Sequence, residues 1–539
     1  MRKLIVIALD GYELSLANAM MDVGQLPSLA SIREKSARYL LDHGSARQTG
    51  LAGEHVSSGL SPKDAERWSA IFFDKENYEV WQEGPLLAPF PSEMRAHTVV
   101  FDLPYFDLSR AGQVHGVVSW GVHDPGTEVM ANPVSLLDEL VDKYGAYPAT
   151  EWIYGIPWPS SERCQRMGNG LAEGASVRAK IALWLLTERF PDWQLALIGV
   201  SESHSALEGL WHGIDERHPL HSHSSSVAAA QGVHKVYQAI DGLVGTLATK
   251  FADATILLFS MHGMGPNRAD VPAMVLLPEL LHRYAFGRSF FVQPDSWTFA
   301  VGGVPILGEN EDWNVATLKS RRERIRAQVA PLLPEYLKGT LKRMLRAKNG
   351  GFVTGGSELL SRRRRSLEWM PAAFCRSRWS QMPAFALPSY YDGRIRINLK
   401  GRERKGVVEL SRYKSCCDEL MRTLELCRDP FSGDCVVDDI EWPGRDEPLD
   451  LPPSGADLIV NWRGSPLCME HPDLGRMGPV PFRRTGGHSG LYGMAYLKSD
   501  ILAPGDYGIR SSFDVVPTLF DLLNERLPSK ISGQSLIRN

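Results

Sequence analysis

The run LIVIALD at Leu4–Asp10, followed by Gly11, decides the fold expected for this chain. Its uninterrupted apolar residues indicate a strand buried on both faces, as in a parallel sheet covered by helices. In such sheets, ligands bind beyond the carboxyl ends of the strands. Asp10 is therefore a candidate metal ligand, although an Asp in this place is also a common helix N-cap.

Similar apolar runs recur along the chain and are separated by segments of helical length. The predicted strands are Thr98–Leu103, Val114–Trp120, Leu195–Val200, Ala254–Ser260 and Asp457–Trp462, and the predicted helical segments include Leu14–Lys35, Ser176–Phe190 and Ser512–Leu523. This alternation predicts an α/β fold with a mostly parallel sheet between two helical layers. Residues 1–285 and 386–539 are expected to form the two parts of a catalytic α/β domain. Residues 286–385 would form a basic helical insertion or cap.

The charge, apolar runs and cysteines of the chain argue against several classes of function. The 539 residues carry a formal net charge of -4, which gives no general attraction to nucleic acid or an anionic membrane. No run approaches the ~20 apolar residues of a membrane helix. The first apolar run is too short for a signal peptide, and the 7 cysteines form no CxxC motif, so a reducing cytoplasm is expected.

The arginine-rich run SRRRRS at Ser361–Ser366 lies in the expected insertion. No aromatic residues are interleaved in it, so nucleic-acid binding is not expected. We interpret it as a solvated surface, with a phosphate contact as the alternative.

The stretch TGLAGEHVSSGLSP at Thr49–Pro62 supplies a candidate nucleophile. A threonine hydroxyl attacks an ester when a cation or a base assists the loss of its proton. A helix that begins near Thr49 would also offer backbone N–H groups to an anionic ester. The alternative is that Thr49 only caps that helix.

Candidate ligands follow the later strands. His204 and Glu208 lie four residues apart, so on a helix they face the same way and can hold one ion together. His262 follows the strand Ala254–Ser260. His488 ends the glycine-containing sequence RRTGGH, and glycine allows a backbone to approach a ligand closely.

Taken together, these motifs resemble the alkaline phosphatase superfamily, and most of all its type I phosphodiesterase/nucleotide pyrophosphatase group. The resemblance rests on Asp10 after the first strand, on Thr49 with Gly59, Leu60 and Pro62, and on the sequence around His488. It implies an alkaline-phosphatase-like three-layer αβα sandwich. It also implies that Thr49 is the nucleophile.

The same resemblance implies two divalent cations, zinc or alternatively manganese. One would bind Asp10, Thr49 and His262, and the other His204, Glu208 and His488. The chain departs from the family at Met261, where a carboxylate ligand is expected, and at Ala52, where many members have Asn. Gln48, Glu54 or His55 could replace that Asn. Contacts to the substrate are expected from Gln48, His55, Arg402 and Arg484.

The expected activity is metal-dependent hydrolysis of a phosphodiester, a pyrophosphate or a related ester. The substrate would be a small phosphorylated or sulfated molecule, and the oligomeric state is left open. Two alternatives remain. One is a phosphoryl or sulfuryl transferase, or a sulfatase-like enzyme, on the same scaffold. The other is a metal-depleted member that binds a ligand without catalysis.

Overall fold

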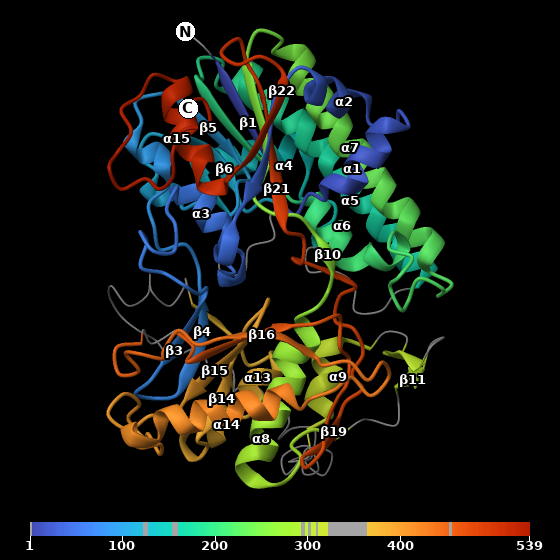
Figure 1. Ribbon diagram of the computed structural model, residues 1–539. Coiled ribbons are helices and arrows are strands. Elements are labelled where there is room, and N and C mark those ends of the chain that lie inside the picture. The colour runs from blue at the N-terminus through green and yellow to red at the C-terminus, as the bar shows by residue number, and fades with distance from the viewer. Residues whose placement is uncertain are drawn as a thin grey trace, which may run out of the picture.

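A computed structural model describes residues 3–121, 128–152, 160–292, 297–299, 303–308, 311–321, 364–451 and 455–538. Residues 322–363 of the predicted basic insertion lie outside the described residues. The described chain forms two lobes, one above the other in Figure 1. Among the described residues, no helix is long and apolar enough to cross a membrane.

The upper lobe is built on a nine-stranded sheet in the order β22-β2-β21-β9-β1-β8-β5-β6-β7. Its strands are β1 (Leu4–Leu9), β2 (Ala37–Asp42), β5 (Thr98–Phe101), β6 (His115–Val118), β7 (Met130–Asn132), β8 (Leu195–Val200), β9 (Thr255–Ser260), β21 (Tyr492–Lys498) and β22 (Gly505–Ser511). β1 lies between β8 and β9 and is parallel to both. Only β21 and β7 run antiparallel to their neighbours. The predicted α/β class with a mostly parallel sheet is confirmed.

Helices cover both faces of this sheet (Figure 1). They are α1 (Leu14–Asp22), α2 (Pro27–Glu34), α3 (Ala52–Ser58), α4 (Leu136–Tyr144), α5 (Ser161–Trp184), α6 (Glu202–Leu210), α7 (Ser226–Lys250) and α15 (Val515–Leu522). Successive residues of a strand point to opposite faces. Accordingly, Ile5 and Ile7 belong to the core beneath α5 and α7, whereas Leu4 and Val6 belong to the core beneath α15. Burial on both faces explains why this strand is apolar throughout.

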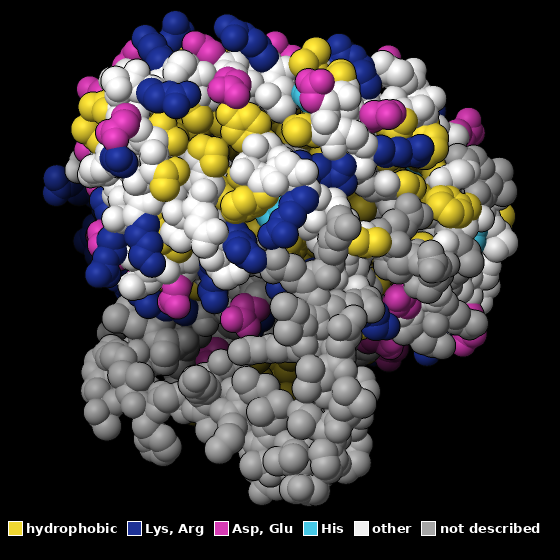
Figure 2. Space-filling view, turned by 90° about the horizontal axis from the view of Figure 1, so that it is seen from below, with side chains coloured by type: hydrophobic (Ala, Val, Ile, Leu, Met, Phe, Trp, Pro, Cys, Tyr) yellow, Lys and Arg dark blue, Asp and Glu magenta, His cyan; other side chains and the backbone are white. Residues whose placement is uncertain are grey.

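The lower lobe has its own core and its own antiparallel sheet, in the order β14-β15-β17-β16. Its elements are β14 (Ala384–Leu387), β15 (Gly393–Ile397), β16 (Val437–Glu441), β17 (Leu458–Trp462), α8 (Leu277–Phe286), α9 (Trp313–Lys319), α13 (Pro371–Phe374) and α14 (Tyr413–Glu425). β3 (Ile71–Asp74) and β4 (Glu79–Glu83) extend down from the N-terminal part of the chain, and β4 pairs with β13 (Arg364–Ser366). Figure 2 shows this lobe from below, with acidic and basic side chains interspersed over its described surface.

The lobe boundaries differ from the predicted division. Residues 386–539 were expected to complete the main sheet, but the strands between 384 and 462 form the smaller one. Burial alternates along Leu458–Trp462, as in an antiparallel sheet with one covered face. The chain returns to the main sheet only at β21.

A buried charge cluster fixes the start of α6, the helix that carries His204 and Glu208. The guanidinium of Arg178 on α5 lies 2.9 Å from Glu202 and 2.8 Å from Asp102, and all three side chains are fully buried. Asp102 also accepts hydrogen bonds from two backbone N–H groups, of Trp120 and Gly121. Arg178 thus joins the carboxyl end of β5 to the first turn of α6.

We expect Arg178→Met to lower the free energy of unfolding by about 3–5 kcal/mol, because it leaves two buried carboxylates without their cation. Urea denaturation of both proteins measures this. Arg189→Met is the control, because Arg189 pairs with Glu139 at a partly exposed position. Its cost should stay below about 1 kcal/mol. Equal effects of the two substitutions would contradict the role given to Arg178.

Candidate active site

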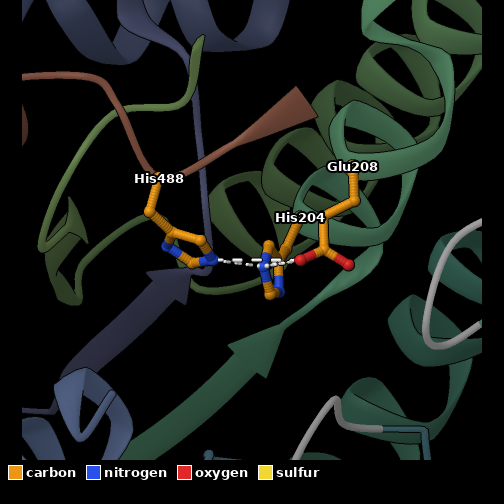
Figure 3. Close-up of side chains that lie close together, drawn as sticks. All are labelled: His204, Glu208 and His488. Atoms are coloured by element: carbon orange, nitrogen blue, oxygen red, sulfur yellow. Dashed lines mark hydrogen bonds and ion pairs between the residues drawn. The ribbon is translucent and has the colours of Figure 1, made fainter. Parts of the chain in front are cut away.

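Four segments bring chemically active side chains to one edge of the main sheet. Asp10 directly follows β1, α6 follows β8, and His262 lies two residues after the end of β9. His488 follows β20 (Gly486–Gly487), a short strand paired with β10 (Gly265–Pro266). Because parallel strands end at the same edge, these groups meet there. Figure 3 shows His204 between His488 and Glu208.

Two glycines allow this close approach. Gly11 has φ +59, and a Cβ on it would lie 3.0 Å from the Cα and the Cβ of His204. A Cβ on Gly486 would lie 2.0 Å from the carbonyl oxygen of Leu207. A side chain at either position would push α6 away from β1 or from the loop that carries His488.

The ligand atoms of His204, Glu208 and His488 form a compact group. His204 Nε2 lies 2.7 Å from His488 Nε2 and 3.2 Å from Glu208 Oε1, and His488 Nε2 lies 4.0 Å from the same oxygen. Ligands at 2.0–2.1 Å from a tetrahedral ion are about 3.3 Å apart. This is the one group of three or more His, Cys, Asp or Glu side chains with such spacing in the described part of the chain.

Contacts around the imidazoles tie them to neighbouring groups. His204 Nδ1 lies 3.2 Å from a carboxylate oxygen of Asp10. His262 Nδ1 lies 3.2 Å from the Gly263 carbonyl oxygen, which can only accept, so this nitrogen donates. Burial is the main cause that lowers the pKa of His262, against the opposing charge of Asp10, and its Nε2 accepts from His488 Nδ1 at 3.2 Å.

His204 Nε2 and His488 Nε2 face each other at hydrogen-bond distance. A divalent cation would replace the hydrogen between them and bind the lone pairs of both nitrogens. Together with the Glu208 carboxylate, the two nitrogens form the mixed N/O ligand set that zinc prefers and manganese tolerates. The residues present therefore fit a divalent cation.

The other predicted cation site, with Asp10, Thr49 and His262 as its ligands, is not assembled in the structure. Asp10 contacts His204 and His262 contacts His488, so each orients a ligand of the first group. The hydroxyl of Thr49 donates to the Ala46 carbonyl at 2.7 Å and accepts from Leu51 N–H at 3.2 Å. Helix α3 begins only at Ala52, so Thr49 ends a 3₁₀ turn (Gly44–Thr49) instead of opening a helix.

Met261 does not face the ligand group. Its side chain is buried in the core beneath α15, whereas His262 lines the cavity described below. Asp270, a possible replacement for the missing carboxylate, accepts from Arg484 at 2.8 and 3.0 Å and pairs with Arg483 at 3.1 Å. Arg484 also contacts Glu208 directly. Burial lowers the pKa of Arg484 to about 9.

Two cavities open beside the ligand group. The first has a volume of about 660 Å³ and is lined by Asp10, His204, His262 and His488, among others. The second has a volume of about 600 Å³. Both are lined by Arg47, Tyr390, Tyr391, Arg484 and His488, so they adjoin across these five residues. The ring of Tyr391 packs edge-on against that of His488, with centroids 4.7 Å apart.

The residues predicted to contact substrate have different places. Arg484 lines both cavities, and Gln48 lines the second while donating to Asn461 at 2.7 Å. His55 is buried against His43 and Phe513, and burial lowers its pKa to about 3. Arg402 is buried in the lower lobe and ion-paired with Asp457 and Glu403. Neither His55 nor Arg402 lines either of the two cavities, so their predicted contacts with substrate have no support.

Sequence reasoning missed Arg47 and Tyr391 as residues of the cleft. No motif marks Tyr391, which lies in the loop before β15. Arg47 lies only two residues before Thr49, and that proximity was the one available signal.

No protein-family model matches the chain, and no curated protein matches it. Solved structures match it over nearly its whole length. The phosphonoacetate hydrolase of Sinorhizobium meliloti 1021, in complex with phosphonoformate, is 13% identical, with a TM-score of 0.46 and coverage of 95% of this chain and 94% of that chain. Murine ectonucleotide pyrophosphatase/phosphodiesterase 5 is 9% identical, with a TM-score of 0.45 and coverage of 99% and 98%.

Wild-type alkaline phosphatase PafA is 9% identical, with a TM-score of 0.47 and coverage of 99% and 98%.

Proposed function

We propose that this chain is a metal-dependent hydrolase of phosphate esters in the alkaline phosphatase superfamily. The observation that carries the proposal is the group formed by His204, Glu208 and His488, with Asp10 and His262 behind the two imidazoles. These side chains come from four separate segments. Asp10, His204, His262 and His488 line a cavity large enough for a small ester.

A divalent cation held by His204, Glu208 and His488 would supply Lewis-acid stabilisation of charge on the phosphoryl oxygens. Asp10 contacts the imidazole of His204 and His262 that of His488, so each would help to orient one ligand. Thr49 is the proposed nucleophile. Its hydroxyl would leave Ala46 by rotation about the Cα–Cβ bond, and its oxygen would bond to phosphorus as the bond to the leaving alcohol breaks and the hydroxyl proton passes to that alcohol. Water would then attack the phosphothreonine, release the phosphate and return a proton to the threonine oxygen.

A second candidate is a binding protein without catalysis. It is favoured by the contact of Arg484 with Glu208, because a guanidinium there competes with a cation for the carboxylate. The bonded position of the Thr49 hydroxyl points the same way. A sulfatase-like or transferase activity uses the same groups and is distinguished by substrate.

An assay with chromogenic esters tests the proposal. Protein dialysed against zinc or manganese is offered a phosphate monoester, a phosphodiester and a sulfate ester of the same phenol. We expect turnover of at least one phosphate ester that stops on chelation and returns with metal. Turnover of the sulfate alone would indicate the sulfatase-like alternative. Metal-loaded protein that cleaves none of the three would favour the binding protein.

A further inference from the structure

Arg47 is a cation in the cleft without an anionic partner in the described part of the chain. Its side chain is half-buried and lines both cavities, so its guanidinium lies where they adjoin. None of the ion pairs among the described residues involves it. Arg483 and Arg484, by contrast, are both paired with Asp270. A guanidinium in this place is available to an anion that enters the cleft.

The other polar side chains considered as substrate contacts on this segment have partners within the protein. Gln48 donates to Asn461, Glu54 is paired with Arg67, and His55 is bonded to His43. Of Gln48, Glu54 and His55, only Gln48 lines a cavity.

Arg47 is close to the ligand group as well. It lines the first cavity together with Asp10, His204 and His262, and its charge contributes to the lowered pKa values of His262 and His43, although burial is the main cause of both. A planar guanidinium can donate two parallel hydrogen bonds to two oxygens of a phosphoryl group.

We propose that Arg47 binds the anionic oxygens of the transferring phosphoryl group. The inference rests on the proposed function for its substrate class, a phosphate ester. It adds the residue that recognises the charge of that substrate. Arg47 acts together with the cation group, from the side of the first cavity that Gly50 also lines.

Binding of inorganic phosphate tests the inference without turnover. Zinc-loaded wild type and Arg47→Gln are titrated with phosphate by calorimetry, and zinc per chain is measured for both. We expect Arg47→Gln to weaken phosphate binding roughly tenfold to a hundredfold, the loss of a charge-assisted pair, at unchanged zinc content. Arg47→Lys should recover part of the affinity, because it restores the charge without the two-pronged geometry.

Arg268→Gln is the matched control, because Arg268 is an exposed arginine that lines only the second cavity. Its effect should stay within about twofold, as for a screened surface charge. Equal losses in Arg47→Gln and Arg268→Gln would overturn the inference in favour of a general field effect. Unchanged binding in Arg47→Gln, or no phosphate binding by wild type, would also overturn it.

The two proposals fail separately. If wild type binds phosphate through Arg47 but cleaves no ester, the inference stands and the proposed hydrolase fails. If wild type cleaves phosphate esters and Arg47→Gln leaves both KM and phosphate affinity unchanged, the hydrolase stands and the inference fails.

Discussion

Thr49→Ala should reduce phosphate-ester turnover at least about a thousandfold, because it removes the group that forms the covalent bond to phosphorus. The measurement is kcat with the best ester found, at saturating metal. The free energy of unfolding should fall by no more than about 2 kcal/mol, since the hydroxyl makes two hydrogen bonds, to the Ala46 carbonyl and from the Leu51 N–H, each worth about 1 kcal/mol. Zinc content should not change either, because Thr49 lies outside the group of His204, Glu208 and His488.

Thr49→Ser is the control for this experiment, because it keeps the hydroxyl and removes only a methyl group. It should retain turnover well above that of Thr49→Ala. A covalent phosphoenzyme trapped by rapid acid quench should appear in wild type and be absent from Thr49→Ala. If Thr49→Ala turns over within tenfold of wild type, attack comes from another group, such as water, and the threonine only stabilises the turn through its bonds to Ala46 and Leu51.

The edge of the sheet at which the site forms follows from local sequence. A buried strand followed at once by a polar residue, as at Asp10, marks the carboxyl end of a parallel strand. The spacing of His204 and Glu208 predicted a shared helix face, and the structure places both on α6 with their side chains 3.2 Å apart. These signals are local, so a single sequence carries them.

Other features depend on contacts between distant segments. β4 pairs with β13, which lies almost three hundred residues later, and no local pattern marks such a pairing. Arg402 and Arg47 are both arginines beside glycine-containing loops, yet one is enclosed by Asp457 and Glu403 and the other lines the cleft. Which of the two meets a carboxylate is decided by the folding of the lower lobe.

Met261 shows how side-chain direction modifies a motif. Residues that follow one another at the end of a strand point to opposite faces. His262 lines the cavity, so Met261 points to the other face and joins the apolar core beneath α15. The substitution thus removes a potential carboxylate without placing a thioether in the site. Asp10, which follows the neighbouring strand β1, is a carboxylate that remains at this edge of the sheet, and it contacts His204.

The geometry of the site predicts one tightly bound divalent cation per chain. His204→Ala and His488→Ala should each reduce the zinc content from about one per chain to below about a tenth, because each removes one of three protein ligands. Turnover should fall about a thousandfold with it, the loss of several kcal/mol of charge stabilisation. His234→Ala, which removes a half-buried imidazole on α7, should leave both quantities unchanged.

Thermal unfolding provides a readout that does not depend on turnover. A cation that binds only the folded state stabilises it, by about 2.7 kcal/mol when its free concentration is 100 times Kd. The stabilisation by zinc should disappear in His204→Ala and His488→Ala, where one of the three protein ligands is missing. A content of two ions per chain would mean that Asp10, His262 and Thr49 rearrange into a second site. A content of none, with turnover intact, would refute metal dependence and leave Arg484 as the cation that satisfies Glu208.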